Sequence, residues 1–456
     1  MDWAKLLNKD RPRKSTNPGD HRAEFERDFD RAIFSTPVKR LQDKAQVFPL
    51  EPHDAVRTRL THSLEVSSVA RGLAAHVAKW LLLKKEIRSG MEHSIEVISA
   101  TCGLIHDLGN PPFGHAGEDA MRQWFQKTSE RESLKEKLTK KPQLVQDFQK
   151  FDGNAQSLRL VGTLQILSDY HGLNLTYATL SASCKYVAQS NKASKNASNR
   201  AMSKPGYFAS ENHLVAEIRK NTGTGIARNP ICFLVEAADD IVNSVADIED
   251  AVKKGIITWK TLEKEISSTK RRMAKKALER TYKILRAGTR SIPNGLADDV
   301  YAAAFRTAVI GMLVPSVGRV FTRNYGSIIS GTYPHNLVDK CNASSLIEWL
   351  QGVGRDRVYC THPTLKLEIM GRKIIMDLMD IFWEGSKYMP ATGQPETKEF
   401  PGKICALISE NYRRVFQNAI KKNEFPETYH RLQLVMDQVC GMTDSFAKRL
   451  HAELTN

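Results

Sequence analysis

The chain has 456 residues, of which 41% are hydrophobic and 26% are charged, a balance typical of globular proteins. Its formal net charge is +16, because 67 lysines and arginines outnumber 51 aspartates and glutamates. Such an excess favours polyanionic partners, either phosphorylated substrates or nucleic acid.

The cysteines and the apolar runs argue against two other classes of protein. The seven cysteines form no C-x-x-C pair, which argues against a disulfide framework or a thiolate zinc site. No apolar run approaches the roughly 20 residues that span a bilayer. The N-terminus has no cleavable signal pattern. We therefore expect a cytoplasmic protein with no membrane partner.

Helical periodicity recurs along the chain, while strand-like alternation is scarce, so we expect an all-α fold. Residues 1–22 predict a basic flexible arm, because they combine basic residues with proline and glycine. Residues 23–255 are interpreted as the catalytic core. A run of Ser, Asn, Lys and Ala at 189–203 predicts a mobile loop within that core. Residues 256–456 are interpreted as a helical extension that packs on the core and completes the substrate site.

Individual helices are expected where apolar residues repeat at helical spacing. They include 23–34, a helix beginning near 62, 230–253, a basic amphipathic helix over 259–286, 298–320, 361–385, 402–420 and 428–452.

One segment, residues 103–118, concentrates polar side chains of the kind that bind metal ions. The apolar residues before it predict a buried helix that ends at His106 and Asp107. Two consecutive prolines then stop this helix, and a new helix restarts after a glycine, close to His115 and Glu118. Burying four such groups without partners would cost several kcal/mol, so we interpret the segment as functional.

Two distant residues extend this cluster. His62 stands at the start of a predicted helix, and Asp239 lies on the buried helix over 230–253. With His106 and Asp107 they supply two imidazoles and two carboxylates, which suit Mn²⁺, Fe²⁺, Zn²⁺ or, less naturally, Mg²⁺. A histidine ordered by a carboxylate, such as the one at 115, is a reasonable acid–base pair at neutral pH.

The spaced pattern of these ligands resembles the HD phosphohydrolase superfamily. Within it, the chain resembles the bacterial deoxyguanosinetriphosphate triphosphohydrolases (dGTPases). The matching segments occur in the family's order, and the resemblance extends over most of the chain, from about 25 to 447. The segments are 40–48, 57–66, 106–118, 151–156, 235–241 and 441–444.

The resemblance implies an HD-domain helical fold with additional C-terminal helices and few or no strands. It implies hydrolysis of a deoxynucleoside triphosphate (dNTP) at the α-phosphorus, giving the deoxynucleoside and inorganic triphosphate. By position, the implied metal ligands are His62, His106, Asp107 and Asp239. The expected metal is Mn²⁺ or Mg²⁺, followed by Fe²⁺ or Zn²⁺. His115 is the implied catalytic histidine, oriented by Glu118.

The resemblance also implies contacts with the substrate. Gln46, beside Val47, matches the position that tests the sugar for a 2′-hydroxyl, and Asp247 falls near the 3′-hydroxyl. Arg59, favoured over Arg57, matches a phosphate-binding arginine. Asn243 departs from the family, which usually has a tyrosine that packs against the deoxyribose at this position. We expect this change to affect discrimination against ribonucleotides or the choice of base.

The implied partners are a dNTP, with dGTP as the first expectation, single-stranded DNA as an effector, and further copies of the chain in a homo-oligomer, with a hexamer expected. Two alternatives stay open. One is a nucleic-acid-binding or sensor HD protein, favoured by the charge and by the basic residues at 265–290. The other is an HD phosphodiesterase or nucleotidase acting on another phosphate ester, against which Gln46 and Arg59 count.

Overall fold

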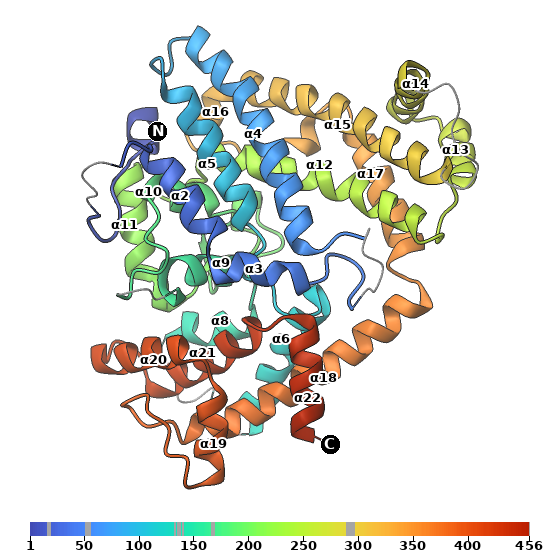
Figure 1. Cartoon of the computed structure of the whole chain (residues 1–456). Helices are drawn as coiled ribbons and strands as arrows, with labels where there is room; N and C mark the ends of the chain where they lie inside the picture. Colours follow the sequence, from blue (N-terminus) through green and yellow to red (C-terminus); the bar gives the residue numbers. More distant parts are fainter. Residues whose placement is uncertain are drawn as a thin grey trace.

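The computed structural model describes residues 1–15, 20–50, 56–131, 134, 138, 141–165, 169–288 and 297–455. These residues form helices almost throughout (Figure 1). The strands in this part of the chain are β1 (Ala188–Gln189) and β2 (Pro205–Tyr207), which pair in parallel. The expected all-α fold is confirmed.

The buried apolar side chains gather into two clusters. The first cluster lies in the upper part of Figure 1 and involves α4 (Arg59–Leu83), α5 (Met91–Ile105), α12 (Pro230–Lys253), α13 (Trp259–Ser268), α14 (Arg272–Gly288), α15 (Ala297–Arg323), α16 (Tyr325–Ile329) and α17 (Ser344–Val353). The second lies below it and involves α6 (Gly114–Arg131), α8 (Pro142–Gln149), α9 (Gly153–Arg159), α11 (Asn212–Thr222), α18 (His362–Lys387), α19 (Phe400–Leu407), α20 (Glu410–Lys422), α21 (Glu427–Cys440) and α22 (Asp444–Thr455).

Further helices and turns complete the described chain. They are α1 (Trp3–Leu6), α2 (Glu24–Ile33), α3 (Thr36–Arg40), α10 (Tyr177–Ser183), the 3₁₀ turns η1 (Leu41–Asp43), η3 (Arg200–Met202), η4 (Ala209–Glu211) and η6 (Val338–Lys340), and the π-helical turns η2 (Leu160–Leu164) and η7 (Gly354–Val358).

Helix α5 takes part in both clusters. Ile98 and Cys102 pack in the first cluster, whereas Leu104 and Ile105 pack in the second. The polar residues that follow Ile105 therefore emerge at the boundary between the two hydrophobic cores.

The two helices that meet α5 at this boundary begin at clear capping signals. The side chain of Asn229 accepts the backbone N–H of Ile231 at 2.9 Å, and Pro230 occupies the first turn of α12. Thr58 caps α4 by accepting the N–H of Thr61. The predicted helix over 230–253 and the helix near 62 are both confirmed.

Three predicted helices are interrupted in the structure. The basic helix over 259–286 breaks at 269–271 into α13 and α14, and the helix over 402–420 breaks into α19 and α20. The helix over 428–452 breaks after Cys440, and α22 restarts at Asp444. Apolar spacing alone does not reveal such breaks, because both halves keep a buried face.

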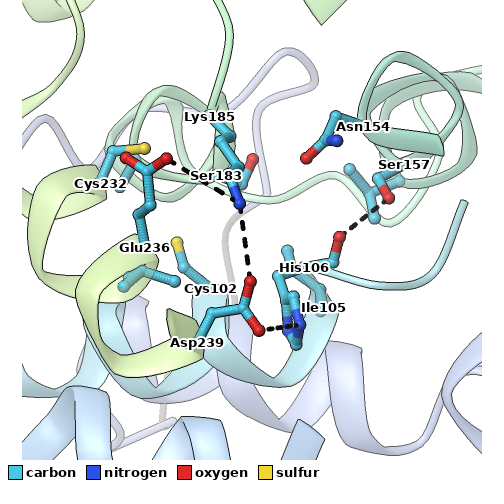
Figure 2. A pocket seen from close by; sticks show the side chains of 13 residues that line it. Cys102, Ile105, His106, Asn154, Ser157, Ser183, Lys185, Cys232, Glu236 and Asp239 are labelled. Carbon is cyan, nitrogen blue, oxygen red and sulfur yellow. Dashed lines mark hydrogen bonds and ion pairs between the residues drawn. The ribbon is translucent and has the colours of Figure 1, made fainter. Parts of the chain in front are cut away.

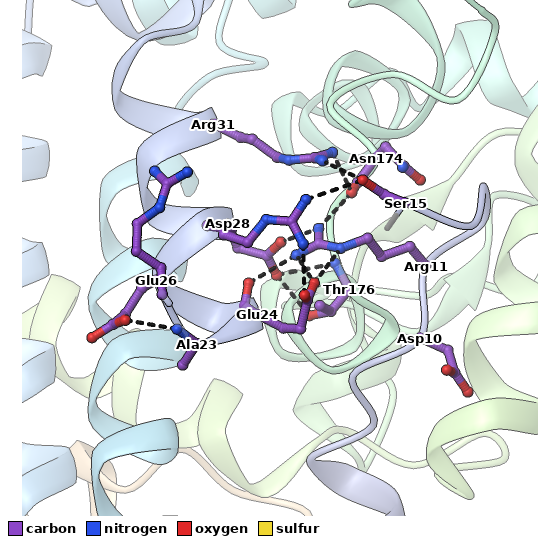
Figure 3. Close-up of polar contacts among 12 residues, drawn as sticks. Asp10, Arg11, Ser15, Ala23, Glu24, Glu26, Asp28, Arg31, Asn174 and Thr176 are labelled. Carbon is purple, nitrogen blue, oxygen red and sulfur yellow. Dashed lines mark hydrogen bonds and ion pairs between the residues drawn. The ribbon is translucent and has the colours of Figure 1, made fainter. Parts of the chain in front are cut away.

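The first 15 residues, expected within a flexible arm, contact the fold in this structure (Figure 3). Trp3 is buried, and Arg11 Nη1 donates to Asp28 Oδ1 at 2.5 Å and to the carbonyl of Asn174 at 2.7 Å. The other oxygen of Asp28 accepts the hydroxyl of Thr176 at 2.6 Å. The composition shows that the segment is basic, but it does not show that Arg11 pairs with the buried carboxylate of Asp28. Residues 16–19 of the expected arm lie outside the described residues.

The segment over 189–203, expected to be mobile, also makes tertiary contacts here. Lys150 Nζ donates to the carbonyls of Ser190 and Ala193 at 3.1 and 2.8 Å. The N–H of Arg200 donates to the carbonyl of Pro334 at 2.9 Å.

Helix α15 is, among the described helices, the one whose length and composition alone would allow it to cross a membrane. Half of its apolar window is buried, and it packs against α4, α12 and α14. These contacts are those of a core helix.

Candidate active site

The structure brings the four predicted metal ligands together. His62, His106 and Asp107 each offer one ligand atom, and these atoms lie within 4.8 Å of one another. Asp239 Oδ1 lies 3.2 Å from His62 Nε2 and 3.5 Å from His106 Nε2. The side chains come from α4, the end of α5 and α12, so the cluster forms where these three helices meet.

The hydrogen bonds around the histidines fit a metal ion. His106 Nδ1 must donate to the carbonyl of Gly103, at 2.7 Å, because a carbonyl can only accept. This bond fixes the tautomer that leaves a lone pair on Nε2. His106 Nε2 and His62 Nδ1 are buried without a hydrogen bond to any residue that the structure describes. Unpaired buried nitrogens are rare, and two imidazoles with two carboxylates form a donor set for a divalent cation.

The charges of the cluster also favour a cation. Burial by itself lowers the pKa of His106, but the carboxylates of Asp107 and Asp239 outweigh it and raise the pKa to about 9. Burial raises the pKa of Asp107, yet Arg59 together with the two histidines outweighs that effect and lowers the pKa to about 2. Burial also raises the pKa of Asp239, but His106, His62 and Lys185 together lower it well below its usual value. The two carboxylates therefore stay charged and attract positive charge to this point.

The two candidate arginines have different environments. Arg57 is buried and bonded to three carboxylates, those of Glu65, Glu249 and Asp250. Arg59 lines the cavity above the cluster and donates to Asp107, and its Nε has no hydrogen-bond partner within the described ranges. Of the two, Arg59 is the arginine that a ligand in the cavity can reach.

A cavity of about 500 Å³ opens over the four candidate metal ligands, and His115 lies on its wall. The His115 side chain is 90% exposed, and its Nδ1 lies 3.2 Å from Oε2 of the buried Glu118. The other oxygen of Glu118 accepts the N–H of Gly153 at 2.8 Å. The hydrogen bond to Glu118 raises the pKa of His115. Burial raises the pKa of Glu118, but His115, the N–H of Gly153 and the charge of Lys204 together outweigh burial and lower it.

The predicted sugar contacts line the same cavity. Gln46 Nε2 donates to Asn243 Oδ1 at 2.8 Å, and Asn243 Nδ2 donates to Asp239 Oδ1 at 2.7 Å. Gln46 is thus linked to Asp239, one of the four candidate metal ligands, through Asn243, which stands where the family usually has a tyrosine. Gln46 Oε1 is buried without a partner among the described residues, and Val47 lies beside it.

One turn further along α12, Asp247 accepts a hydrogen bond from the Tyr359 hydroxyl. Burial raises the pKa of Asp247 to about 6. Tyr359 lines the cavity and was not expected from the sequence, because nothing local connects it to α12.

Two lysines and a tyrosine next to β1 and β2 also line the cavity and were not expected from the sequence. Figure 2 shows Lys185 between Glu236 and Asp239, with Nζ–O distances of 3.9 and 3.5 Å. Lys204 Nζ lies 3.1 Å from Asp152, and Tyr186 lines the cavity beside it. A usable signal existed, because these residues flank the polar run over 189–203 at both ends.

Gly206 explains how the two ends of that run come so close. A Cβ at this position would lie 2.0 Å from the carbonyl oxygen of Tyr186, so only glycine permits this approach of the two strands.

Comparison with known proteins agrees with this geometry. Residues 59–151 match the HD domain. The chain is 38% identical to a deoxyguanosinetriphosphate triphosphohydrolase-like protein of Listeria monocytogenes, over 100% of this chain and 99% of the relative. It is 33% identical to a deoxyguanosinetriphosphate triphosphohydrolase of Klebsiella pneumoniae, over 93% of this chain and 92% of the relative.

The HD match spans His62, His106 and Asp107, and the relatives match along nearly the whole chain, including α12 and the C-terminal helices. The chain therefore belongs to the deoxyguanosinetriphosphate triphosphohydrolase family, within the HD superfamily of phosphohydrolases.

Proposed function

We propose that this protein is a metal-dependent dNTP triphosphohydrolase, which converts a deoxynucleoside triphosphate into the deoxynucleoside and inorganic triphosphate. The observation that carries the proposal is the cluster of His62, His106, Asp107 and Asp239 at the base of a large cavity whose wall bears the His115–Glu118 pair. The preferred substrate in this proposal is dGTP, and the enzyme works in the cytoplasm.

The four clustered residues would hold the metal ion, with Mn²⁺ or Mg²⁺ proposed ahead of Fe²⁺ and Zn²⁺. When bound, such an ion supplies Lewis-acid polarisation of a phosphoryl oxygen and lowers the pKa of water. His106 presents Nε2 for this purpose, because the carbonyl of Gly103 occupies its Nδ1.

His115 is the proposed proton-transfer residue. Glu118 holds its Nδ1, which leaves Nε2 to exchange a proton with the reacting group. The Gly153 N–H fixes the other oxygen of Glu118, so the carboxylate holds the imidazole in one orientation. The raised pKa keeps a larger share of His115 protonated at neutral pH, as proton donation to a leaving 5′-oxygen requires.

The basic side chains on the cavity wall are proposed to bind the triphosphate. Arg59, Lys185 and Lys204 all line the cavity, and each is near a carboxylate, those of Asp107, Asp239 and Asp152 respectively. These carboxylates hold the cations in place before substrate arrives, so that little reorganisation accompanies the charge shift of phosphoryl transfer.

The sugar is proposed to lie between Gln46 and α12. Gln46 and Val47 would contact the 2′ edge, and Asp247 would accept the 3′-hydroxyl after exchanging its bond with Tyr359. Asn243 would orient Gln46 instead of stacking on the sugar.

A four-dNTP panel with product analysis tests this function. The purified protein with Mn²⁺ or Mg²⁺ is expected to release triphosphate from at least dGTP, and more slowly from GTP. Release of pyrophosphate or orthophosphate instead would refute cleavage at the α-phosphorus. Activity on phosphate monoesters or cyclic nucleotides alone would favour the phosphodiesterase or nucleotidase reading.

We also propose that residues 23–255 form the catalytic core and that 256–456 complete the substrate site. The cavity lining supports this division, because Gln351, Tyr359 and Glu368 come from the second region. A homohexamer is the proposed assembly. Sedimentation velocity of the full chain measures its mass directly, and a monomer would refute the hexamer.

A second candidate function is binding of single-stranded DNA, as an effector or as the main activity of a sensor. The exposed face around α14 favours it, since this face carries one acidic residue, Glu279, and seven basic residues. The basic residues are Arg271, Arg272, Lys275, Lys276, Arg280, Lys283 and Arg286. Titration of single-stranded DNA at several salt concentrations should give an affinity that falls steeply with salt. Lack of binding at low salt, or an unchanged affinity in K275E/K276E, would refute this role.

A further inference from the structure

The junction between α21 and α22 holds two loops of the active site at once, through a single buried side chain. Asp444, the first residue of α22, is 2% exposed. Its Oδ2 accepts the backbone N–H of Ala45 at 2.9 Å, and its Oδ1 accepts the backbone N–H of Phe113 at 3.0 Å. Ala45 precedes Gln46, and Phe113 lies two residues before His115.

Both loops have a backbone that an external hydrogen bond would stabilise. Phe113 has φ 61°, in the left-handed region that non-glycine residues rarely adopt, and Gly114 follows it with φ 56°. An external hydrogen bond therefore helps to keep this turn in the conformation that aims His115 at the cavity. Ala45 lies in an irregular segment whose nearest regular contact is a single bridge to Thr58.

Neighbouring contacts strengthen the same junction. Lys44 Nζ donates to the carbonyl of Cys440 at 2.9 Å and to that of Asn110 at 2.6 Å. Asn110 Nδ2 in turn donates to Asp107 Oδ1 at 2.7 Å. The last turn of α21 and the first residue of α22 thus contact the loop of Gln46 and the segment that links Asp107 to His115.

We propose that Asp444 is a positioning residue, which fixes the sugar-contacting loop of Gln46 and the turn of His115 relative to each other. The inference rests on the proposed function, because that function gives Gln46 its role in sugar recognition and His115 its role in proton transfer. Asp444 neither lines the cavity nor belongs to the group of candidate metal ligands.

The substitution D444N tests this role with little change of shape. An asparagine keeps one acceptor oxygen but replaces the other with an NH₂ group, which cannot accept, so either Ala45 or Phe113 loses its bond. We expect kcat on dGTP to fall about 10- to 100-fold, the loss typical of misplaced reacting groups. The preference for dGTP over GTP in kcat/KM should fall as well, while Mn²⁺ should stabilise the variant as it does the wild type.

A second variant reaches the same turn from the opposite side. Gly371, in α18, packs so closely on Phe113 that an added Cβ would lie 2.5 Å from the ring. G371A should displace Phe113 and lower kcat, although alanine is favourable within a helix. The matched control is D377N, which removes the carboxylate charge of Asp377 and so weakens its 2.7 Å contact with His451, elsewhere on α22. D377N should keep the wild-type kcat and nucleotide preference.

Amide hydrogen exchange separates the failure of this inference from the failure of the proposed function. In D444N the N–H of Ala45 or Phe113 should exchange at least about 10-fold faster, while amides within α4 keep their protection. A wild-type protein that releases no triphosphate would refute the proposed function. Amide hydrogen exchange would then still test whether Asp444 holds the two loops. Unchanged exchange at both amides, or wild-type kcat and nucleotide preference in D444N, would overturn the proposal.

Discussion

The side chains around the cavity gain their properties from specific neighbours. His115 is exposed on the wall, yet its pKa is raised because buried Glu118 accepts a hydrogen bond from it and stabilises the imidazolium. The NH₂ of Gln46 donates to Asn243, and its Oε1 has no partner among the residues that the structure describes. Both residues therefore present a single defined atom to a ligand.

The pH dependence of turnover should report on the His115–Glu118 pair. In E118Q the carboxylate charge is lost, so the imidazolium is less stable and the pKa of His115 falls. The limb of the kcat–pH profile that belongs to His115 should therefore move to lower pH than in the wild type. D119N is the control, because Asp119 is exposed and bonds to Arg122 rather than to His115. A limb that stays in place in E118Q, or moves equally in D119N, would contradict the pairing.

Removal of Asn243 should weaken sugar recognition. In N243A, Gln46 Nε2 loses its acceptor, and one net hydrogen bond of about 1 kcal/mol corresponds to roughly a fivefold rise in KM for dGTP. The preference for dGTP over GTP should fall, because Gln46 can then rotate. Steady-state kinetics with both nucleotides measures this, and N221A, on the remote helix α11, serves as control. An unchanged preference would show that Asn243 does not orient Gln46.

At the level of helices and segments, contacts across the sequence decide what a local pattern cannot. The bounds of α12 follow from its cap, its proline and its apolar stripe, so the sequence predicts them correctly. The break after Cys440 has a weaker signal, since Gly441 stands within a stretch of continuous apolar spacing, and it is this break that places Asp444 between two loops. Tyr359 likewise reaches the cavity only through the packing of η7 on α12.

The candidate site shows the same division. His62, His106, Asp107 and Asp239 could be inferred because their residue types and spacing are distinctive and follow helix boundaries. For Lys185 and Lys204 the sequence shows only that they lie near the two ends of the run over 189–203, and their place at the cavity depends on the pairing of β1 with β2 across that run. Tertiary pairing of this kind is not written in local periodicity.

The N-terminal segment should contribute measurably to stability. In R11A the buried carboxylate of Asp28 loses its charged partner, and breaking a buried pair typically costs about 3 kcal/mol or more. Urea unfolding of the full chain should show this loss as a lower midpoint. R22A is the matched control in the same segment, since Arg22 is solvent-exposed, and it should leave the midpoint unchanged. Equal midpoints for R11A and the wild type would support an arm that does not pack in solution.

For the whole molecule, the proposed metal site lies at the boundary of two hydrophobic cores, so a bound ion should stabilise the contact between them. α4 and α12 belong to the first cluster, and the end of α5 belongs to the second. A ligand that binds only the folded state stabilises it by about 2.7 kcal/mol at one hundred times its Kd.

Metal binding can thus be measured without turnover. After chelation, Mn²⁺ should raise the Tm of the wild type in a concentration-dependent way. In H106A this rise should be absent, because one imidazole ligand is gone and the site loses its affinity. An equal rise in H106A would show that Mn²⁺ stabilises the protein from another site.

The central claim concerns which bond is broken, and hydrolysis in ¹⁸O-labelled water tests it most directly. Digestion of dGTP by the metal-loaded protein should give deoxyguanosine without label and triphosphate that carries one ¹⁸O atom, because water attacks the α-phosphorus and the 5′-oxygen leaves with the sugar. Label in deoxyguanosine, or label in orthophosphate or pyrophosphate in place of triphosphate, would contradict a triphosphohydrolase that acts at the α-phosphorus.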